Sequence, residues 1–245
     1  MKEELGLYIH IPYCESKCGY CDFTSYTDQV HTIPAYLQAL SMEARRYSGC
    51  VVNTVYIGGG TPSCLRAGDI FNLMHSLREE IDICQDAEVS IEANPNSLSM
   101  EKAEEFWAAG INRLSIGLQT IQDDLLKYIG RTHVYEDFQK ALKNAVKIGF
   151  SNISADLMYS LPGERVQQAI ESARAIVQLP LTHISAYALR LERGTPLYGA
   201  KQPDETQDRE MFHGMKQVFE EAGFKRYEIS NFAKSGYCCR HNLKY

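Results

Sequence analysis

The stretch "LYIHIPYCESKCGYCDF" (residues 7–23) determines how the rest of the chain is interpreted. It opens with a short apolar, β-branched run at 7–11. Cys14, Cys18 and Cys21 then follow in a C-x3-C-x2-C array. Thiols placed directly after a strand would stand at the carboxyl end of a parallel sheet, where βα-loops build sites. The stretch therefore predicts a first strand that leads into a loop carrying the chemistry.

Composition limits the classes of protein to which the chain can belong. Its 245 residues carry 25 basic and 31 acidic side chains, a formal charge of −6. This mild acidity gives no support to a nucleic-acid partner. No apolar run approaches the roughly 20 residues of a membrane span, although peripheral membrane association stays open. The first residues lack a signal peptide, so we expect a cytoplasmic protein whose eight cysteines serve metal binding or catalysis rather than disulfides.

Strand-like and helix-like segments alternate along most of the chain. The strand-like runs are 7–11, 54–58, 88–93, 113–118, 153–159 and 183–189, and the helical segments between them are 35–47, 67–81, 100–110, 135–149 and 166–179. Such alternation predicts an α/β fold with a parallel sheet. Polar motifs follow several different strands, which favours a TIM-like part-barrel of the (β/α)6 type over a doubly wound sheet with one switch point. We assign residues 1–195 to this core.

The pattern changes in residues 196–245. A loop is followed by a predicted helix over 204–224, a short strand at 226–230 and a final loop. We interpret this part as the start of a truncated C-terminal region that leads into a missing C-terminal domain.

Two chemical interpretations of the cysteine array stand side by side. A structural zinc site needs four closed ligands. The next cysteines, Cys50, Cys64 and Cys84, are isolated, and His10, the other fourth-ligand candidate, lies inside the first strand. A [4Fe–4S] cluster held by three thiolates would instead leave one iron open to an external ligand.

The array and its companions resemble a known superfamily. C-x3-C-x2-C after a first strand is similar to the signature of the radical S-adenosylmethionine (SAM) superfamily, and YIGGGTPS (56–63) resembles its glycine-rich motif. Further pieces resemble, in order, the HemW family of heme chaperones, which are relatives of oxygen-independent coproporphyrinogen III oxidase; they are SIEANP (90–95), RLSIGLQT (113–120), IGRTH (129–133), DLMYSLPG (156–163), GTPLY (194–198), YEISNFA (227–233) and RHNLKY (240–245). The resemblance implies a radical SAM part-barrel with porphyrin-related function.

The resemblance also implies a set of site residues. Cys14, Cys18 and Cys21 would ligate the [4Fe–4S] cluster. The SAM-binding candidates are Tyr8 over the junction of SAM and cluster, Tyr20 through its backbone, Gly59, Gly60 and Thr61 at the methionyl end, Glu92 as an acceptor, Gln119, Arg131, Asp156 and Ala188. Each of the polar and aromatic candidates has a structural alternative, as a core-edge aromatic, a turn cap or a solvated helix end.

Some residues of this chain differ from the family pattern, and these differences favour the heme chaperones over the oxidase. The decarboxylating oxidase has a fourth cysteine where this chain has Phe23, and an extension ahead of its first strand. Ser160 stands where glycine is usual, and Glu164 where glutamine is usual. His241, in the H-N-x-x-Y motif, is a candidate heme ligand, with the adjacent Cys238 and Cys239 as alternatives.

These features predict a heme-binding radical SAM protein that delivers heme to acceptor hemoproteins. The alternative is oxygen-independent coproporphyrinogen III oxidase activity, which Phe23 makes the less favoured. A zinc protein and a tRNA-modifying radical enzyme rank below both. The sequence leaves open whether SAM is cleaved, and it does not determine the oligomeric state.

Overall fold

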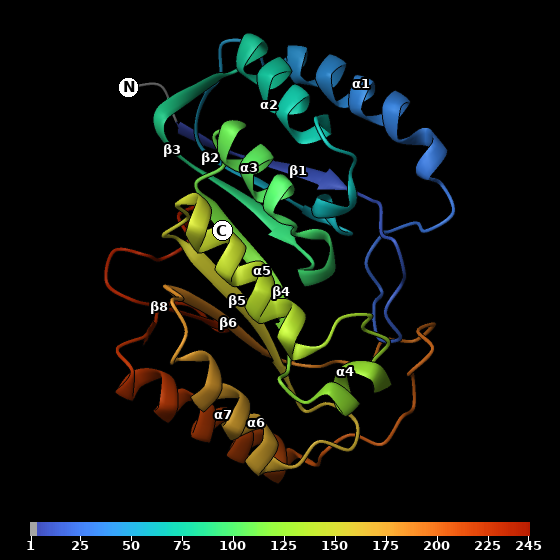
Figure 1. The fold of residues 1–245 in the computed structure, drawn as a ribbon, viewed down its shortest axis with the longest axis vertical. Coiled ribbons are helices and arrows are strands. Elements are labelled where there is room, and N and C mark those ends of the chain that lie inside the picture. The colour runs from blue at the N-terminus through green and yellow to red at the C-terminus, as the bar shows by residue number, and fades with distance from the viewer. Residues whose placement is uncertain (1–3) are drawn as a thin grey trace.

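The computed structural model describes residues 4–245 and shows one curved sheet with helices along its outer face (Figure 1). The strands are β1 (Glu4–Ile11), β2 (Val51–Gly59), β3 (Asp82–Ala93), β4 (Arg113–Gln119), β5 (Ile153–Tyr159), β6 (His183–Ala188), β7 (Lys225–Arg226) and β8 (Asn231–Ala233). The helices are α1 (Ile33–Ala44), α2 (Asp69–Glu80), α3 (Met100–Ala108), α4 (Asp123–Tyr128), α5 (Tyr135–Ile148), α6 (Val166–Ile176) and α7 (Glu205–Glu221). Short 3-10 helices are η1 (Val30–Thr32), η2 (Arg45–Tyr47), η3 (Pro62–Cys64), η4 (Pro95–Ser97) and η5 (Asn242–Lys244).

The first six strands pair in chain order and are all parallel. Each crossover between neighbouring strands carries at least one helix, as parallel connections require. Within residues 4–245 the sheet runs from β1 at one edge to β7 at the other, in the order β1-β2-β3-β4-β5-β6-β8-β7. The predicted α/β part-barrel with six parallel strands is therefore confirmed.

The two faces of the sheet differ in chemistry. On the outer face, apolar side chains such as Ile57, Ile91 and Ile116 are completely buried against the helices. The register places Glu92 beside Ser115 on the opposite, inner face, and Asp156 beside Ser185. Because side chains alternate along a strand, most of the inward-facing residues of β3 to β6 are polar, with Gly117 and Met158 as exceptions. The interior is therefore lined mainly by polar side chains, which suits a bound ligand, and is not packed with aliphatic side chains.

The structure differs from the sequence-based expectations at two places. Helix α4 was not predicted, because its 6 residues are too few to show a helical hydrophobic period. The strand predicted at 226–230 is wrong: β7 ends at Arg226, and Tyr227 to Ser230 form a turn before β8. The turn is stabilised by Glu228, whose carboxylate accepts hydrogen bonds from the Ser230 amide and the Asn231 side chain.

The segment after the sixth parallel strand joins the same sheet. Strand β8 runs antiparallel to β6, and β7 antiparallel to β8. Helix α7 approaches α6 closely, because a Cβ at Gly214 would lie only 2.6 Å from Ile170 Cδ1. The division of the chain at residue 195 stays a prediction. Among the described residues, no helix has the length and apolar character needed to cross a membrane.

Candidate functional site

A cavity of about 370 Å³ opens at the carboxyl ends of the parallel strands. Its walls come from the loop after β1, the glycine-rich loop after β2, the ends of β3 to β6 and the α4–α5 connection. Among the predicted site residues, those that line it are Cys14, Cys18, Tyr20, Cys21, Gly59, Gly60, Thr61, Glu92, Gln119, Arg131, Asp156 and Ala188. The structure therefore brings together residues from positions 14 to 188 of the chain.

The loop after β1 carries all three thiols of the array to the cavity. Cys14 is buried, and Cys18 and Cys21 are half-buried. The Cys14 amide donates to the Tyr26 carbonyl at 3.0 Å, which closes the base of the loop. The Gly19 amide donates to the Ile129 carbonyl at 3.0 Å, which fixes the tip of the loop to the end of α4. The unpredicted helix α4 thus has a role in holding the thiol loop.

The glycine-rich loop packs against this thiol loop at backbone distance. The Gly60 amide donates to the Ile11 carbonyl at 2.8 Å, and the Thr61 amide donates to the Tyr13 carbonyl at 2.7 Å. A Cβ at Gly60 would lie 2.6 Å from the Tyr13 carbonyl oxygen and 3.0 Å from Cys14 Sγ. The Thr61 hydroxyl donates to Cys14 Sγ at 3.4 Å. Glycine is required here because the two loops meet without space for a side chain.

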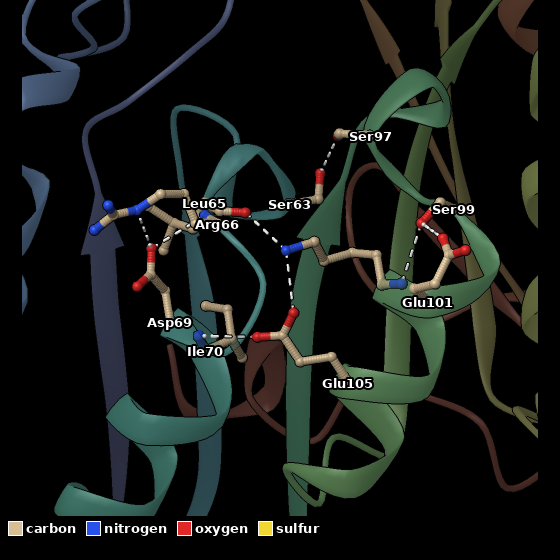
Figure 2. A network of polar contacts seen from close by, with 10 residues as sticks. Ser63, Leu65, Arg66, Asp69, Ile70, Ser97, Ser99, Glu101 and Glu105 are labelled. Carbon is tan, nitrogen blue, oxygen red and sulfur yellow. Dashed lines mark hydrogen bonds and ion pairs between the residues drawn. The ribbon is translucent and has the colours of Figure 1, made fainter.

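Polar contacts around α2 and α3 brace the far end of the glycine-rich loop (Figure 2). The Ser63 and Ser97 hydroxyls are 2.6 Å apart. The Glu105 carboxylate accepts a hydrogen bond from the Ile70 amide at 3.2 Å. Lys102 donates both to Glu105 at 3.1 Å and to the Leu65 carbonyl at 2.7 Å. This network joins the loop after β2 to the helix after β3, so the cavity wall at residues 59–61 has a rigid support.

Glu92 lies on the inner face at the base of the cavity. Its carboxylate accepts hydrogen bonds from the Tyr56 hydroxyl at 2.9 Å and from the Gly59 amide at 3.2 Å. Burial, together with the nearby Asp156, raises the pKa of Glu92 to about 7. A carboxylate tuned to neutral pH inside a cavity is a feature of ligand-binding and catalytic sites.

Arg131 connects the thiol loop to the strands. Its guanidinium donates to Cys18 Sγ at 3.6 Å and to the Gly117 carbonyl at 2.8 Å. The Nε atom is buried and has no hydrogen-bond partner among the described residues. The guanidinium therefore places a positive charge beside the thiol loop and joins that loop to the end of β4.

Gln119 and Asp156 complete the base of the cavity. Gln119 adopts φ 75°, a left-handed conformation that is costly for a residue with a side chain. Its amide oxygen accepts a hydrogen bond from the Tyr187 hydroxyl at 3.3 Å. Ser115 donates to Asp156 at 3.0 Å, and burial raises the pKa of Asp156. Backbone strain of this kind concentrates at functional sites, so Gln119 joins the site on a structural observation of its own.

Sequence reasoning missed several residues of the lining. They include Asn94, Ser115, Gly117, Met158 and Tyr187. Ser115 and Gly117 alternate with the apolar residues of β4, and Tyr187 follows Ser185 at the same spacing in β6. This period of two, applied strand by strand, is the signal that would have found them.

Two predicted residues lie outside the cavity. Tyr8 does not line it: its ring stacks on Tyr56 with 6.2 Å between centroids, and its hydroxyl is 3.1 Å from His10 Nδ1. His241 is buried nearer the opposite end of the barrel, with Nδ1 3.0 Å from Thr54 Oγ1. The structure therefore separates the heme-ligand candidate from the thiol cavity.

The donor set fits a cluster better than a single zinc ion. Within residues 4–245, no group of three or more His, Cys, Asp and Glu side chains lies close enough to enclose one metal ion. Both ring nitrogens of His10 already contact hydrogen-bond partners, Tyr8 and the Thr24 carbonyl. Three thiols on one loop, beside a glycine cradle and an arginine, suit a multi-iron cluster, whose cysteines each bind a different iron.

Comparisons with known proteins agree with this geometry. A sequence profile described as the radical SAM superfamily matches residues 8–176. The heme chaperone HemW of Bacillus subtilis is 40% identical over 97% of this chain, and HemW of Escherichia coli is 36% identical over 98%. In both cases the chain spans 66% of the relative's length. The structure of E. coli coproporphyrinogen III oxidase (HemN), described as a radical SAM enzyme, superposes with a TM-score of 0.88 at 27% identity, covering 96% of this chain and 56% of that one.

Proposed function

The chain belongs to the radical SAM superfamily, and from that premise we propose that it is part of a heme chaperone of the HemW type. In this proposal the cavity holds a [4Fe–4S] cluster and SAM, and the whole protein binds heme and delivers it to acceptor hemoproteins. The observation that carries the proposal is the convergence of three thiols, the glycine cradle and Glu92 on one cavity.

Each part of the cavity has a role in the proposal. Cys14, Cys18 and Cys21 would hold the cluster, which when bound and reduced would supply a coordination site and an electron for SAM chemistry. The backbone at Gly59 and Gly60 lets the methionyl end of SAM approach closely. Glu92 accepts hydrogen bonds from SAM, and Arg131 offers a planar fork suited to a carboxylate.

The heme part rests on the sequence relatives and on Phe23. Relatives that are 36% and 40% identical carry the name heme chaperone HemW. Phe23 lines the mouth of the cavity and is 65% exposed, at the position where the decarboxylating relative has a cysteine. The proposal places the protein in the cytoplasm.

Anaerobic reconstitution of the full-length protein tests the proposal. We expect iron and sulfide in the ratio of one [4Fe–4S] cluster, loss of both in the Cys14→Ser, Cys18→Ser, Cys21→Ser triple variant, and saturable SAM binding. Heme titration followed by absorbance should show stoichiometric binding, and an apo-hemoprotein added afterwards should take up the heme. Zinc in place of iron, or absence of heme binding, would contradict the proposal.

The second candidate is coproporphyrinogen III oxidase activity, which the close superposition on HemN favours. Incubation of the reconstituted protein with SAM, reductant and coproporphyrinogen III decides between the two. We expect no protoporphyrinogen. Product formed over several turnovers would instead make the chain an oxidase.

A further inference from the structure

The last residues of the chain enter the part-barrel at the end where the strands begin. Cys239 is completely buried and His241 is 4% exposed. The His241 backbone amide donates to the Glu88 carboxylate at 3.2 Å, and the Cys239 thiol donates to the same oxygen at 3.4 Å. At the rim, Lys244 donates to the Glu4 carbonyl at 2.8 Å. We call residues 239–245 the barrel plug.

The first strand has a glycine at the place where the plug enters. A Cβ at Gly6 would lie 2.8 Å from Lys244 Cδ, 3.0 Å from Thr54 Oγ1 and 3.3 Å from His241 Cε1. A side chain at Gly6 would therefore displace the plug. The absence of a side chain at Gly6 leaves the space that Lys244 and His241 occupy.

The imidazole of His241 is held from several sides. Nδ1 is 3.0 Å from the Thr54 hydroxyl, and Nε2 is 3.3 Å from the Tyr245 hydroxyl. The ring stacks on Tyr56 with 5.3 Å between centroids and an interplanar angle of 27°. Burial lowers the pKa of His241 and so favours the neutral ring.

Tyr56 contacts both His241 and the cavity residue Glu92. Its hydroxyl donates to Glu92 Oε1 at 2.9 Å, and the other carboxylate oxygen of Glu92 accepts the Gly59 amide at 3.2 Å. A continuous series of contacts therefore runs from His241 through Tyr56 and Glu92 to the glycine cradle. Without His241, the Tyr56 ring would keep only its longer contact with Tyr8, at 6.2 Å between centroids, so it would gain freedom and its hydrogen bond to Glu92 would weaken.

We infer that His241 is a positioning residue for the SAM cavity: it fixes Tyr56, which orients Glu92 and the backbone at Gly59. The inference rests on the proposed function insofar as SAM is the occupant of the cavity. It also assigns His241 a role other than heme ligation, because both ring nitrogens are hydrogen-bonded and the ring is enclosed. Heme iron must then take its ligand from another residue while the plug is in place.

Titration of the reconstituted full-length protein with SAM tests the inference. We expect His241→Ala to weaken SAM affinity about tenfold, the effect of losing about 1.4 kcal/mol. His241→Phe keeps a ring against Tyr56 and should restore part of that loss. Tyr56→Phe removes only the hydroxyl bound to Glu92 and should weaken SAM to a similar degree. The double variant His241→Ala, Tyr56→Phe should bind about as weakly as either single variant, because both act through one contact series.

Cys239→Ser is the matched control, since it alters a buried hydrogen bond of the same plug without contacting Tyr56, and we expect unchanged SAM affinity. Hydrogen–deuterium exchange of the peptide containing Gly59 gives a readout without SAM. His241→Ala and Tyr56→Phe should speed exchange at Gly59, and Cys239→Ser should not. These exchange rates test the inference even if the protein proves not to bind SAM.

Two results would overturn the inference. One is SAM affinity and Gly59 exchange within twofold of wild type in both His241→Ala and Tyr56→Phe. The other is loss of heme absorbance in His241→Ala with SAM affinity unchanged, which would make His241 a heme ligand. Retained heme binding together with weakened SAM affinity supports the positioning role.

Discussion

The guanidinium of Arg131 lies 3.6 Å from the Sγ of Cys18, although 113 positions separate the two residues in the chain. The same guanidinium donates to the Gly117 carbonyl at 2.8 Å. One side chain therefore links the thiol loop to the end of β4, and this link sets what substitutions at residue 131 should do.

Arg131→Lys should retain the cluster and weaken SAM binding about tenfold, because an ammonium keeps the charge beside Cys18 but lacks the planar fork. Arg131→Gln loses the charge as well and should also reduce the iron content. Iron analysis and SAM titration measure the two effects. Arg193→Gln, at an exposed position outside the cavity, is the control and should change neither.

Gly60→Ala should prevent the thiol loop and the glycine-rich loop from closing together. The added methyl group would lie 2.6 Å from the Tyr13 carbonyl oxygen, and such overpacking costs about 1–3 kcal/mol. Lower iron content after reconstitution and a lower unfolding temperature are expected. Gly236→Ala is the control: its Cβ would meet no atom within 4 Å, but φ 85° makes the substitution strained, so it should lower the unfolding temperature and leave the iron content unchanged. Full cluster loading in Gly60→Ala would contradict the close packing of the two loops.

SAM affinity should rise with pH through the titration of Glu92. The pKa of Glu92 is raised to about 7, mainly by burial, so below that pH the carboxyl is protonated and loses acceptor capacity. Dissociation constants measured between about pH 6 and pH 8 should fall as the carboxylate forms. In Glu92→Gln the affinity should be weaker and should no longer follow this titration. An unchanged pH profile in that variant would assign the dependence to another group.

Folding stability should decrease between about pH 4.5 and pH 7 because of Glu164. Its pKa is raised from 4.5 to about 7 by burial, so the folded state binds the proton more tightly than the unfolded state. The stabilisation is complete below the unfolded pKa and is lost as pH rises through the folded pKa. Glu164→Gln keeps an acceptor for the Leu161 amide and should stabilise the protein at pH 8 by on the order of 2 kcal/mol. Urea unfolding of the apoprotein at pH 5 and pH 8 measures the difference, which should be small at pH 5.

The three thiols of the array should behave differently from the remaining cysteines. Cys14→Ser, Cys18→Ser and Cys21→Ser should each lose most of the iron, because oxygen replaces a cluster-binding thiolate. Cys50→Ser is the matched control, since Cys50 lies outside the cavity lining, and it should retain wild-type iron and sulfide. Iron loss of equal size in the Cys50 variant would indicate general destabilisation rather than ligand removal.

Ser160 shows how the structure explains a departure that the sequence only flagged. The family usually has glycine at this position, and Ser160 adopts φ 59°, the left-handed region that glycine enters without cost. The serine hydroxyl donates to Asp208, a contact with α7 that glycine lacks. The sequence could identify the unusual residue, but the strained backbone and its partner became visible only in the fold.

The alternation of strands and helices, the thiol array and the glycine-rich loop could be read directly from the amino-acid sequence, because these patterns are local and follow from side-chain period and spacing. Which distant residues meet became known only from the three-dimensional fold. Strand register placed Glu92, Gln119 and Asp156 in one cavity and left Tyr8 outside it. Burial of the barrel plug placed His241 against Tyr56 rather than in the thiol cavity. Contacts of this kind depend on the closure and register of the whole sheet, which no short stretch of the chain encodes.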